Sequence, residues 1–316
     1  MKLSVILPCF NGASTISVQL AALTRQHWPD GWELIVVNNG STDQSMEIAQ
    51  AYRDGLPHLQ IVEAHVPNTP RLGVPHSYNT GIKAATGHAF VFCEADDEVG
   101  AGWLTAMGEA LTDHPFVVAR LDYAKLNKES IRPPYENGYG YQSEKIRRLR
   151  WSPYYLSASA CGFGLQRSLY EQLGPLSTEF PIVHDSEYCC RAQLAHHTPH
   201  FEPAALVHYR LKPTLSGRFR QAQNWGRDST RLEHHYSGLK RYALLRQLFW
   251  IARTPLGLPL PTLMFATRSV RARQLLNEWV WQLGWATGKL QAIVQVSRLP
   301  AKRRPAVGAC QDGLRY

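Results

Sequence analysis

The sequence lacks the features that mark several large classes of protein. No run of about 20 apolar residues occurs, so we expect no segment to span a bilayer. The first apolar run is also too short for a signal peptide. The motifs G-x-G-x-x-G, G-x-x-x-x-G-K-[ST], G-x-S-x-G and H-E-x-x-H are all missing. Dehydrogenases, P-loop kinases, α/β-hydrolases and zinc proteases therefore have no sequence support.

Cysteine is scarce and scattered along the chain. Six cysteines occur, at positions 9, 93, 161, 189, 190 and 310. None forms a C-x-x-C pair, and the adjacent Cys189 and Cys190 have poor geometry for bonding each other. Five of the six lie in apolar surroundings, which predicts buried, reduced thiols in a cytoplasmic protein.

Positive charge is unevenly distributed. Residues 1–209 hold 15 Lys and Arg against 21 Asp and Glu, a net charge of −6. Residues 210–316 hold 19 against 4, a net charge of +15, which points to an anionic surface near that end. Nucleic acid would be one such surface, but the chain carries no recognised nucleic-acid module and no interleaved aromatic motif. We therefore expect no nucleic-acid partner.

Short apolar runs alternate with amphipathic segments through the first hundred residues. This alternation predicts an α/β fold, with a parallel sheet covered by helices on both faces. Further helices are expected towards the C-terminus, whereas residues 120–160 give no clear pattern. Strands are predicted at 3–7, 33–37, 59–63 and 88–93. Helices are predicted at 14–24, from the turn at 38–43 to residue 51, and at 79–85, 168–173, 185–194 and 275–290.

Polar clusters follow three of these predicted strands, namely residues 9–11, 38–43 and 94–98. Each alone is ordinary turn chemistry, but ligands of such sheets bind beyond the carboxyl ends of the strands. The third cluster places four carboxylates within five residues, where like charges repel. A hard divalent cation such as Mg²⁺ or Mn²⁺ would remove that repulsion, and a solvated acidic loop is the alternative.

Two further residues are candidates for chemistry. Asp185 lies in the first turn of a predicted helix, where a carboxylate serves either as a cap or as a general base. His208 ends a strand-like run, and such a histidine is either structural or a ligand.

In this order and spacing, the motifs resemble those of glycosyltransferase family 2. The resemblance covers about residues 2–230 and implies a GT-A fold, a Rossmann-like and mostly parallel sheet flanked by helices. The matching segments are the opening strand and nucleotide loop at 4–12, the second loop at 36–43, the lead-in at 79–87, Glu94-Ala95-Asp96-Asp97 where the family has D-A-D-D, the acceptor-side loop and helix at 162–174, His184-Asp185 where the family has E-D, and His208.

The resemblance implies transfer of a sugar, with inversion, from a nucleotide-diphosphate donor to a hydroxyl of a glycan, lipid-linked or small-molecule acceptor. A UDP-sugar is the first expectation, with GDP and dTDP as alternatives. By position, Asp185 would be the base, Mn²⁺ or Mg²⁺ would bind Asp96, His208, Glu94 and Asp97, and the 162–164 loop would face the acceptor. The implied donor residues are Pro8, Phe10, Asn11, Asn39, Asp43, Asn79, Glu94, Ala95 and Asp96, and the implied acceptor-loop residues are Gly162, Phe163 and Gly164.

Three departures from the family pattern concern function. Asn38-Asn39 replaces at least one acid in the loop expected to read the base, Glu94 replaces Asp, and His184 replaces Glu. A non-catalytic relative that only binds nucleotide sugars therefore remains an alternative.

The basic C-terminal region is expected to be a helical extension, residues 231–316, following a catalytic domain at 1–230. Basic residues beside Trp and Leu suit an interfacial helix on an anionic leaflet, so the hypothesis is peripheral attachment to the cytoplasmic face of a membrane. The alternative is that the aromatic residues pack within the protein. The residues concerned are Arg241, Arg246, Arg253, Arg268, Arg271, Arg273, Lys302, Arg303, Arg304, Trp250, Trp279, Trp281 and Trp285.

Overall fold

The computed structural model divides the chain into two compact units. The first comprises Met1–Leu126 and Tyr135–Arg210, and the second comprises Asn127–Pro134 and Leu211–Tyr316. The structure describes all residues except 57, 132–141, 150, 153–154, 238–268 and 297–316. The sequence placed a boundary at residue 230, which lies inside the continuous helix α7 (Leu215–Ser237).

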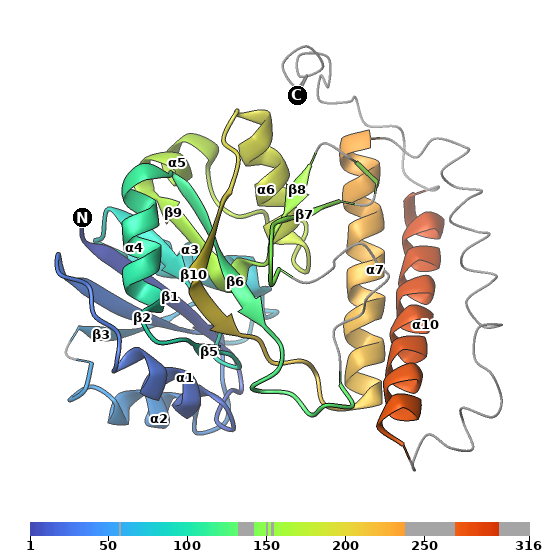
Figure 1. The fold of residues 1–316 in the computed structure, drawn as a ribbon, viewed down its shortest axis with the longest axis horizontal. Coiled ribbons are helices and arrows are strands. Elements are labelled where there is room, and N and C mark those ends of the chain that lie inside the picture. Colours follow the sequence, from blue (N-terminus) through green and yellow to red (C-terminus); the bar gives the residue numbers. More distant parts are fainter. Residues whose placement is uncertain (57, 132–141, 150, 153–154, 238–268, 297–316) are drawn as a thin grey trace. The chain divides into compact units, whose positions relative to one another are not determined.

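An eight-stranded sheet forms the centre of the first unit (Figure 1). Its strand order is β3-β2-β1-β4-β9-β6-β10-β5. Four neighbouring pairs are parallel, whereas β9 runs antiparallel to both its neighbours and β5 runs antiparallel to β10. The strands are β1 (Leu3–Cys9), β2 (Trp32–Asn38), β3 (Leu59–Glu63), β4 (Ala89–Phe92), β5 (Glu98–Val99), β6 (Phe116–Asp122), β9 (Phe163–Gln166) and β10 (His200–His208), and a separate hairpin pairs β7 (Arg147–Arg148) with β8 (Leu156–Ser157).

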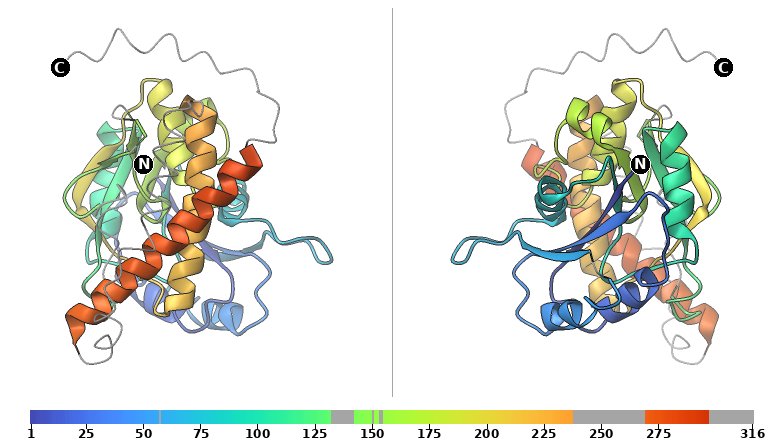
Figure 2. Two further views of the ribbon diagram at one scale, coloured as in Figure 1. Left: turned by 90° about the vertical axis from the view of Figure 1, so that its right-hand side faces the viewer. Right: turned by 90° about the vertical axis from the view of Figure 1, so that its left-hand side faces the viewer.

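Helices cover both faces of this sheet, as the alternation of apolar runs predicts (Figure 2). Side chains of β1 alternate between two cores, with Val5 in one and Ile6 in the other. The first core includes α1, α2 and α4, and the second includes α3, α5 and α6. The helices are α1 (Ile16–Leu23), α2 (Ser45–Ala51), α3 (Val74–Ala84), α4 (Trp103–Asp113), α5 (Arg167–Leu173) and α6 (His184–Leu194), with the short 3₁₀ turn η1 (Ala160–Gly162).

Besides the boundary inside α7, and α4 and β6, which the sequence did not indicate, the structure differs from the prediction at α3 and β9. Helix α3 begins at Val74 rather than near residue 79, because Pro75 occupies its first turn, where no backbone N–H is needed. Strand β9 lies antiparallel between β4 and β6, in a segment that the sequence indicated only as a loop. The prediction of a mostly parallel, helix-flanked sheet is confirmed.

Glu33 organises the polar end of the sheet where β1 and β2 begin. Its carboxylate accepts hydrogen bonds from the Ser4 hydroxyl at 2.6 Å and from the backbone N–H and hydroxyl of Thr86 at 2.7 and 2.8 Å. Burial alone would raise the pKa of Glu33, but these hydrogen bonds outweigh it and hold the pKa below its usual value. The group therefore stabilises the fold in its ionised form.

The second unit contains α7 and α10 (Val270–Val296), which pack tightly against each other. A Cβ on Gly226 would collide with the Trp285 backbone, and a Cβ on Gly288 would collide with the Gln223 backbone. The two helix backbones can approach so closely only because these positions carry no side chain. Among the helices that the structure describes, none is long and apolar enough to cross a membrane.

Five cysteines lie in the described part of the chain, and all five are buried and unpaired, as the sequence predicts. They are Cys9, Cys93, Cys161, Cys189 and Cys190.

Candidate active site

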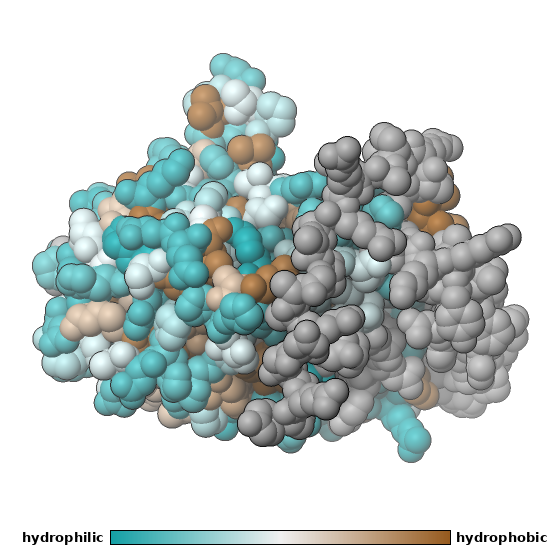
Figure 3. All heavy atoms as spheres, turned by 90° about the horizontal axis from the view of Figure 1, so that it is seen from above, coloured by the Kyte–Doolittle hydropathy of each residue, from teal (hydrophilic) through white to brown (hydrophobic). Residues whose placement is uncertain are grey.

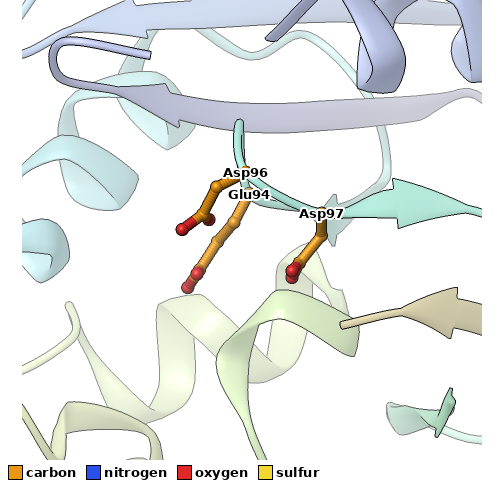
Figure 4. A group of neighbouring side chains, drawn as sticks. All are labelled: Glu94, Asp96 and Asp97. Carbon is orange, nitrogen blue, oxygen red and sulfur yellow. The ribbon is translucent and has the colours of Figure 1, made fainter. Parts of the chain in front are cut away.

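Three carboxylates gather in the segment that joins β4 to β5. The ligand oxygens of Glu94, Asp96 and Asp97 all lie within 4.8 Å of one another. Their side chains project toward the same side of the segment (Figure 4). Asp97 is buried, and its Oδ1 accepts a hydrogen bond from the backbone N–H of Arg210 at 2.8 Å.

This carboxylate cluster fits a divalent cation. Hard oxygen donors at this spacing are the ligands that Mg²⁺ and Mn²⁺ take in proteins. Glu94, with its extra methylene, reaches the same point as the two aspartates. The residues needed to hold such an ion are therefore present.

His208 does not join the cluster. Its Nδ1 lies 2.8 Å from Oδ2 of Asp122, the residue opposite it on β6. The next residue, Tyr209, is affected by the charge of the cluster: its pKa is raised first by burial and then by the charges of Glu94 and Asp97. The contact with Asp122 engages one of the two ring nitrogens of His208. Its role as a metal ligand stays a prediction.

Asp185 and the carboxylate cluster converge on a single buried thiol. Cys161 lies in η1, and burial and then the charges of Asp97, Glu94, Asp185 and Asp96 raise its pKa well above the usual value. The contacts agree, since the Ser186 hydroxyl at the start of α6 lies 2.8 Å from that of Ser157, three residues before η1, and β4 packs against η1. This brings together the residues that the sequence predicted as base and as metal ligands.

Glu187, the first alternative to Asp185 as a base, already has a strong partner. Arg191 donates to both of its carboxylate oxygens, at 3.1 and 2.8 Å. The same guanidinium donates to the carbonyl oxygens of Leu173 and Pro175, which ties α6 to the end of α5. Glu187 and Arg191 thus hold the helix that carries Asp185, whose half-buried side chain lies two residues before Glu187.

His184, which stands where the family has Glu, is neutral and buried. Burial lowers its pKa, even though the neighbouring charge of Asp185 acts in the opposite direction. Its ring lies 6.1 Å from the ring of Tyr78. The first turn of the helix carries Asp185 and Glu187, and the substitution at His184 leaves both carboxylates in place.

The two predicted nucleotide loops are joined by hydrogen bonds at the carboxyl ends of β1 and β2. Oδ1 of Asn11 accepts from the backbone N–H of Thr42 at 2.8 Å, and Oδ2 of Asp43 accepts from Ala13 at 3.0 Å. Asn11 has a φ of 49°, a left-handed conformation that asparagine tolerates better than most residues. Hydrogen bonds from Ser45 are the first cause of the lowered pKa of Asp43, so its assigned donor role has a structural alternative.

Asn39 is held in one orientation. Its Nδ2 donates to the carbonyl of Leu72 at 2.8 Å, whereas its buried Oδ1 has no hydrogen-bond partner within the described chain. The half-exposed ring of Phe10 lies nearby in the first loop, with the guanidinium of Arg71 3.4 Å above its centroid. The two predicted nucleotide loops thus contain a buried amide oxygen without a partner in the described chain and an aromatic ring that is partly exposed.

Two other predicted site residues, Asn79 and Phe163, make contacts within the protein itself. Both polar atoms of Asn79 bond the backbone of Leu176, at 2.8 and 2.9 Å. Phe163 is a core residue packed on Phe92 and Phe116. The donor role of Asn79 and the acceptor role of Phe163 stay predictions.

Packing also accounts for the small residues in these loops. A Cβ on Gly162 would lie 2.9 Å from Ala119, and one on Gly164 would lie 2.7 Å from the Met107 methyl. Ala95 is buried in the first core, and Pro8 lies half-buried within β1. Packing within the protein is thus sufficient to explain why these residue types stand at these positions, and their roles in binding stay predictions.

Comparison with known proteins identifies the family. The model described as Glycosyl transferase family 2 matches residues 4–174, more than half of the 316 residues. The chain belongs to glycosyltransferase family 2. The matched segment contains both nucleotide loops, the carboxylate cluster and η1.

Family 2 relatives match over part of their length. The uncharacterized glycosyltransferase YibD of Escherichia coli K12 is 37% identical over 150 residues, which is 47% of this chain and 40% of the relative. The poly(ribitol-phosphate) beta-N-acetylglucosaminyltransferase TarS of Staphylococcus aureus Mu50 is 31% identical over 132 residues, 42% of this chain and 22% of TarS. In both cases the aligned region spans less than half of the relative.

Solved family structures share the fold. The mannosyltransferase PcManGT of Pyrobaculum calidifontis, in complex with GDP-Man and Mn²⁺, has a TM-score of 0.60 at 20% identity, covering 91% of this chain and 86% of that one. Residues 1–349 of S. aureus TarS with UDP have a TM-score of 0.53 at 17% identity, covering 94% and 92%. These matches confirm the GT-A fold.

Proposed function

We propose that the chain transfers a sugar from a nucleotide-diphosphate donor to an acceptor hydroxyl, with inversion of the anomeric centre and with Asp185 as the base. The observation that carries this proposal is that two elements meet near η1: Ser186, next to Asp185, bonds Ser157 three residues before η1, and β4, which leads into the carboxylate cluster, packs against η1. Direct displacement at a sugar carbon needs a base and a diphosphate-binding centre that are held close to each other. The elements around η1 would provide both.

Asp185 suits the role of base because its carboxylate is half-buried at the start of α6 and pairs with no basic side chain in the described chain. An acceptor hydroxyl that reaches this carboxylate would give up its proton as its oxygen attacks the sugar. Glu187 is held by Arg191 and is the weaker candidate.

Glu94, Asp96 and Asp97 would hold Mn²⁺ or Mg²⁺, with the oxygen chemistry described above. When bound, the ion supplies positive charge that offsets the negative charge developing on the leaving diphosphate. The Mn²⁺ bound with GDP-Man in PcManGT supports this assignment.

Asn39 is the residue proposed to contact the base. One hydrogen of its Nδ2 bonds the carbonyl oxygen of Leu72, which leaves the second hydrogen and the buried Oδ1, an acceptor that would take an N–H donor of the base. Uracil and thymine offer such a donor at N3, and guanine offers one at N1. UDP-sugars remain the first expectation, with GDP- and dTDP-sugars as alternatives, and the UDP bound by TarS agrees with that order.

Attachment to an anionic membrane through the C-terminal region stays a prediction. Of the tryptophans invoked for it, Trp281 and Trp285 are buried in the second unit, 2% and 8% exposed, which favours packing for these two. The described atoms seen in Figure 3 are mostly hydrophilic. Only Arg271 and Arg273 of the nine basic residues named in the sequence analysis lie within the described residues. The other seven, and Trp250, lie outside them.

The decisive experiment is a donor screen that measures nucleotide release with Mn²⁺, using UDP-, GDP- and dTDP-sugars with and without simple glycan acceptors. We expect release from one nucleotide class, dependent on the metal. Binding of a nucleotide sugar without any release would instead support the non-catalytic alternative.

A further inference from the structure

Arg210 lies two residues beyond the end of β10 and makes two hydrogen bonds to the loop that carries the cluster. Its backbone N–H donates to Oδ1 of Asp97 at 2.8 Å, and its Nε donates to the carbonyl oxygen of Asp96 at 2.7 Å. The second bond fixes the plane of the guanidinium beside the carboxylates. Arg210 is thereby a cation held in place, not a mobile surface charge.

The outer nitrogens of this guanidinium are available. Within the described chain, Nη1 and Nη2 of Arg210 take part in no hydrogen bond or ion pair. Two other cations of the first unit differ, since Lys125 is paired with Glu98 at 2.7 Å and Arg191 with Glu187 at 2.8 Å. A planar guanidinium with free outer nitrogens is the group that binds phosphate oxygens with two parallel hydrogen bonds.

The charge balance of the site also calls for such a group. Three carboxylates leave one negative charge when a single divalent ion is bound among them. A diphosphate brings further negative charge to the same place, and like charges this close repel. A fixed arginine at the edge of the cluster offsets part of this repulsion.

We propose that Arg210 binds the diphosphate of the donor through Nη1 and Nη2, oriented by the bond from its Nε to Asp96. This inference rests on the proposed function, because it assumes a nucleotide-diphosphate donor. It adds a binding residue that the sequence motifs did not indicate, two residues beyond the end of β10.

The test compares ligands with and without phosphate. Binding of UDP, uridine, GDP and guanosine would be measured by titration calorimetry with Mn²⁺, for the wild type and for Arg210→Met. This variant removes the charge but keeps the backbone N–H on Asp97. We expect a loss of about 10–100-fold in affinity for whichever nucleoside diphosphate binds, the range for hydrogen bonds to charged groups, and unchanged affinity for its nucleoside.

Two further variants sharpen the comparison. Arg210→Lys keeps the charge without the planar group and should recover only part of the affinity. Lys125→Met removes a cation that is already paired, so it should leave UDP and GDP affinity unchanged. Thermal melting checks that each variant is folded.

Three outcomes would overturn the assignment. One is unchanged diphosphate affinity in Arg210→Met, and another is an equal loss for nucleoside and nucleoside diphosphate. The third is a matching loss of Mn²⁺ affinity without nucleotide, which would make Arg210 only a support for the loop. Failure of the wild type to bind any nucleoside diphosphate would instead overturn the proposed function.

Discussion

The assignment of Asp185 as the base can be tested by comparison with Glu187. Glu187 forms an ion pair with Arg191, whereas Asp185 pairs with no basic side chain in the described chain. Asp185→Asn removes proton acceptance but changes little in volume. General-base catalysis contributes about 10²–10⁴-fold, so we expect turnover to fall by that factor, equivalent to about 3–5 kcal/mol. Donor binding and thermal stability should stay at wild-type values.

Glu187→Gln should do the reverse. It breaks the two-pronged pair with Arg191, in which the Glu187 side chain is 9% exposed and the Arg191 side chain 25% exposed. Hydrogen bonds to charged groups contribute about 1.5–3 kcal/mol, which shifts the melting temperature by about 3–12 °C in a unit of this size. Turnover per folded molecule should change far less than in Asp185→Asn.

Initial rates of nucleotide release, single-turnover rates and thermal melts of both variants decide the matter. The reasoning is refuted if Asp185→Asn keeps near wild-type turnover, or if Glu187→Gln stays fully stable and loses transfer. Either result would move the base away from Asp185.

Four further results are expected. Asp96→Ala should lose Mn²⁺ binding by calorimetry and lose turnover without unfolding, and full wild-type activity in EDTA would contradict a metal-dependent reaction. Asn39→Asp loses its donor to Leu72 and should change the relative affinities for UDP, GDP and dTDP, whereas unchanged ratios would contradict its role in reading the base. Because the folded-state pKa of Glu33 lies below its unfolded value, its stabilisation is present at neutral pH and is lost as the pH falls through that range. Urea unfolding should therefore show Glu33→Gln less stable at pH 7, with the difference shrinking below about pH 4. Co-sedimentation should show the full chain on anionic liposomes at low salt and not at high salt, while equal binding to neutral liposomes would contradict an electrostatic attachment.

The sequence allowed the sheet, the carboxylate cluster and Asp185 to be predicted, because polar residues directly after buried apolar runs mark strand ends. The pairing of β9 between β4 and β6 could not be predicted, since a short apolar segment carries no signal for strand direction. Arg210 was also missed, because one of its two bonds comes from the backbone and both partners are distant in sequence.

Asn38 shows how tertiary context explains a departure from the family motif. Asn38 lies opposite Glu63 in the register of β2 and β3, and its Nδ2 donates to both carboxylate oxygens at 3.1 and 2.9 Å. An aspartate there would face a like charge across the strands, which is destabilising. The amide suits its neighbour, a reason that the local motif does not contain.

The glycines between α7 and α10 determine where the chain can be shortened. Gly226 and Gly288 allow the backbones of the two helices to come into contact. Removing either helix therefore exposes the packing surface of the other. Ending the chain at residue 230 would cut α7 and leave its apolar face, including Ala222, without a partner. A truncated catalytic unit should instead end after Arg210, at the division between the two units, so that it keeps both bonds to the cluster loop.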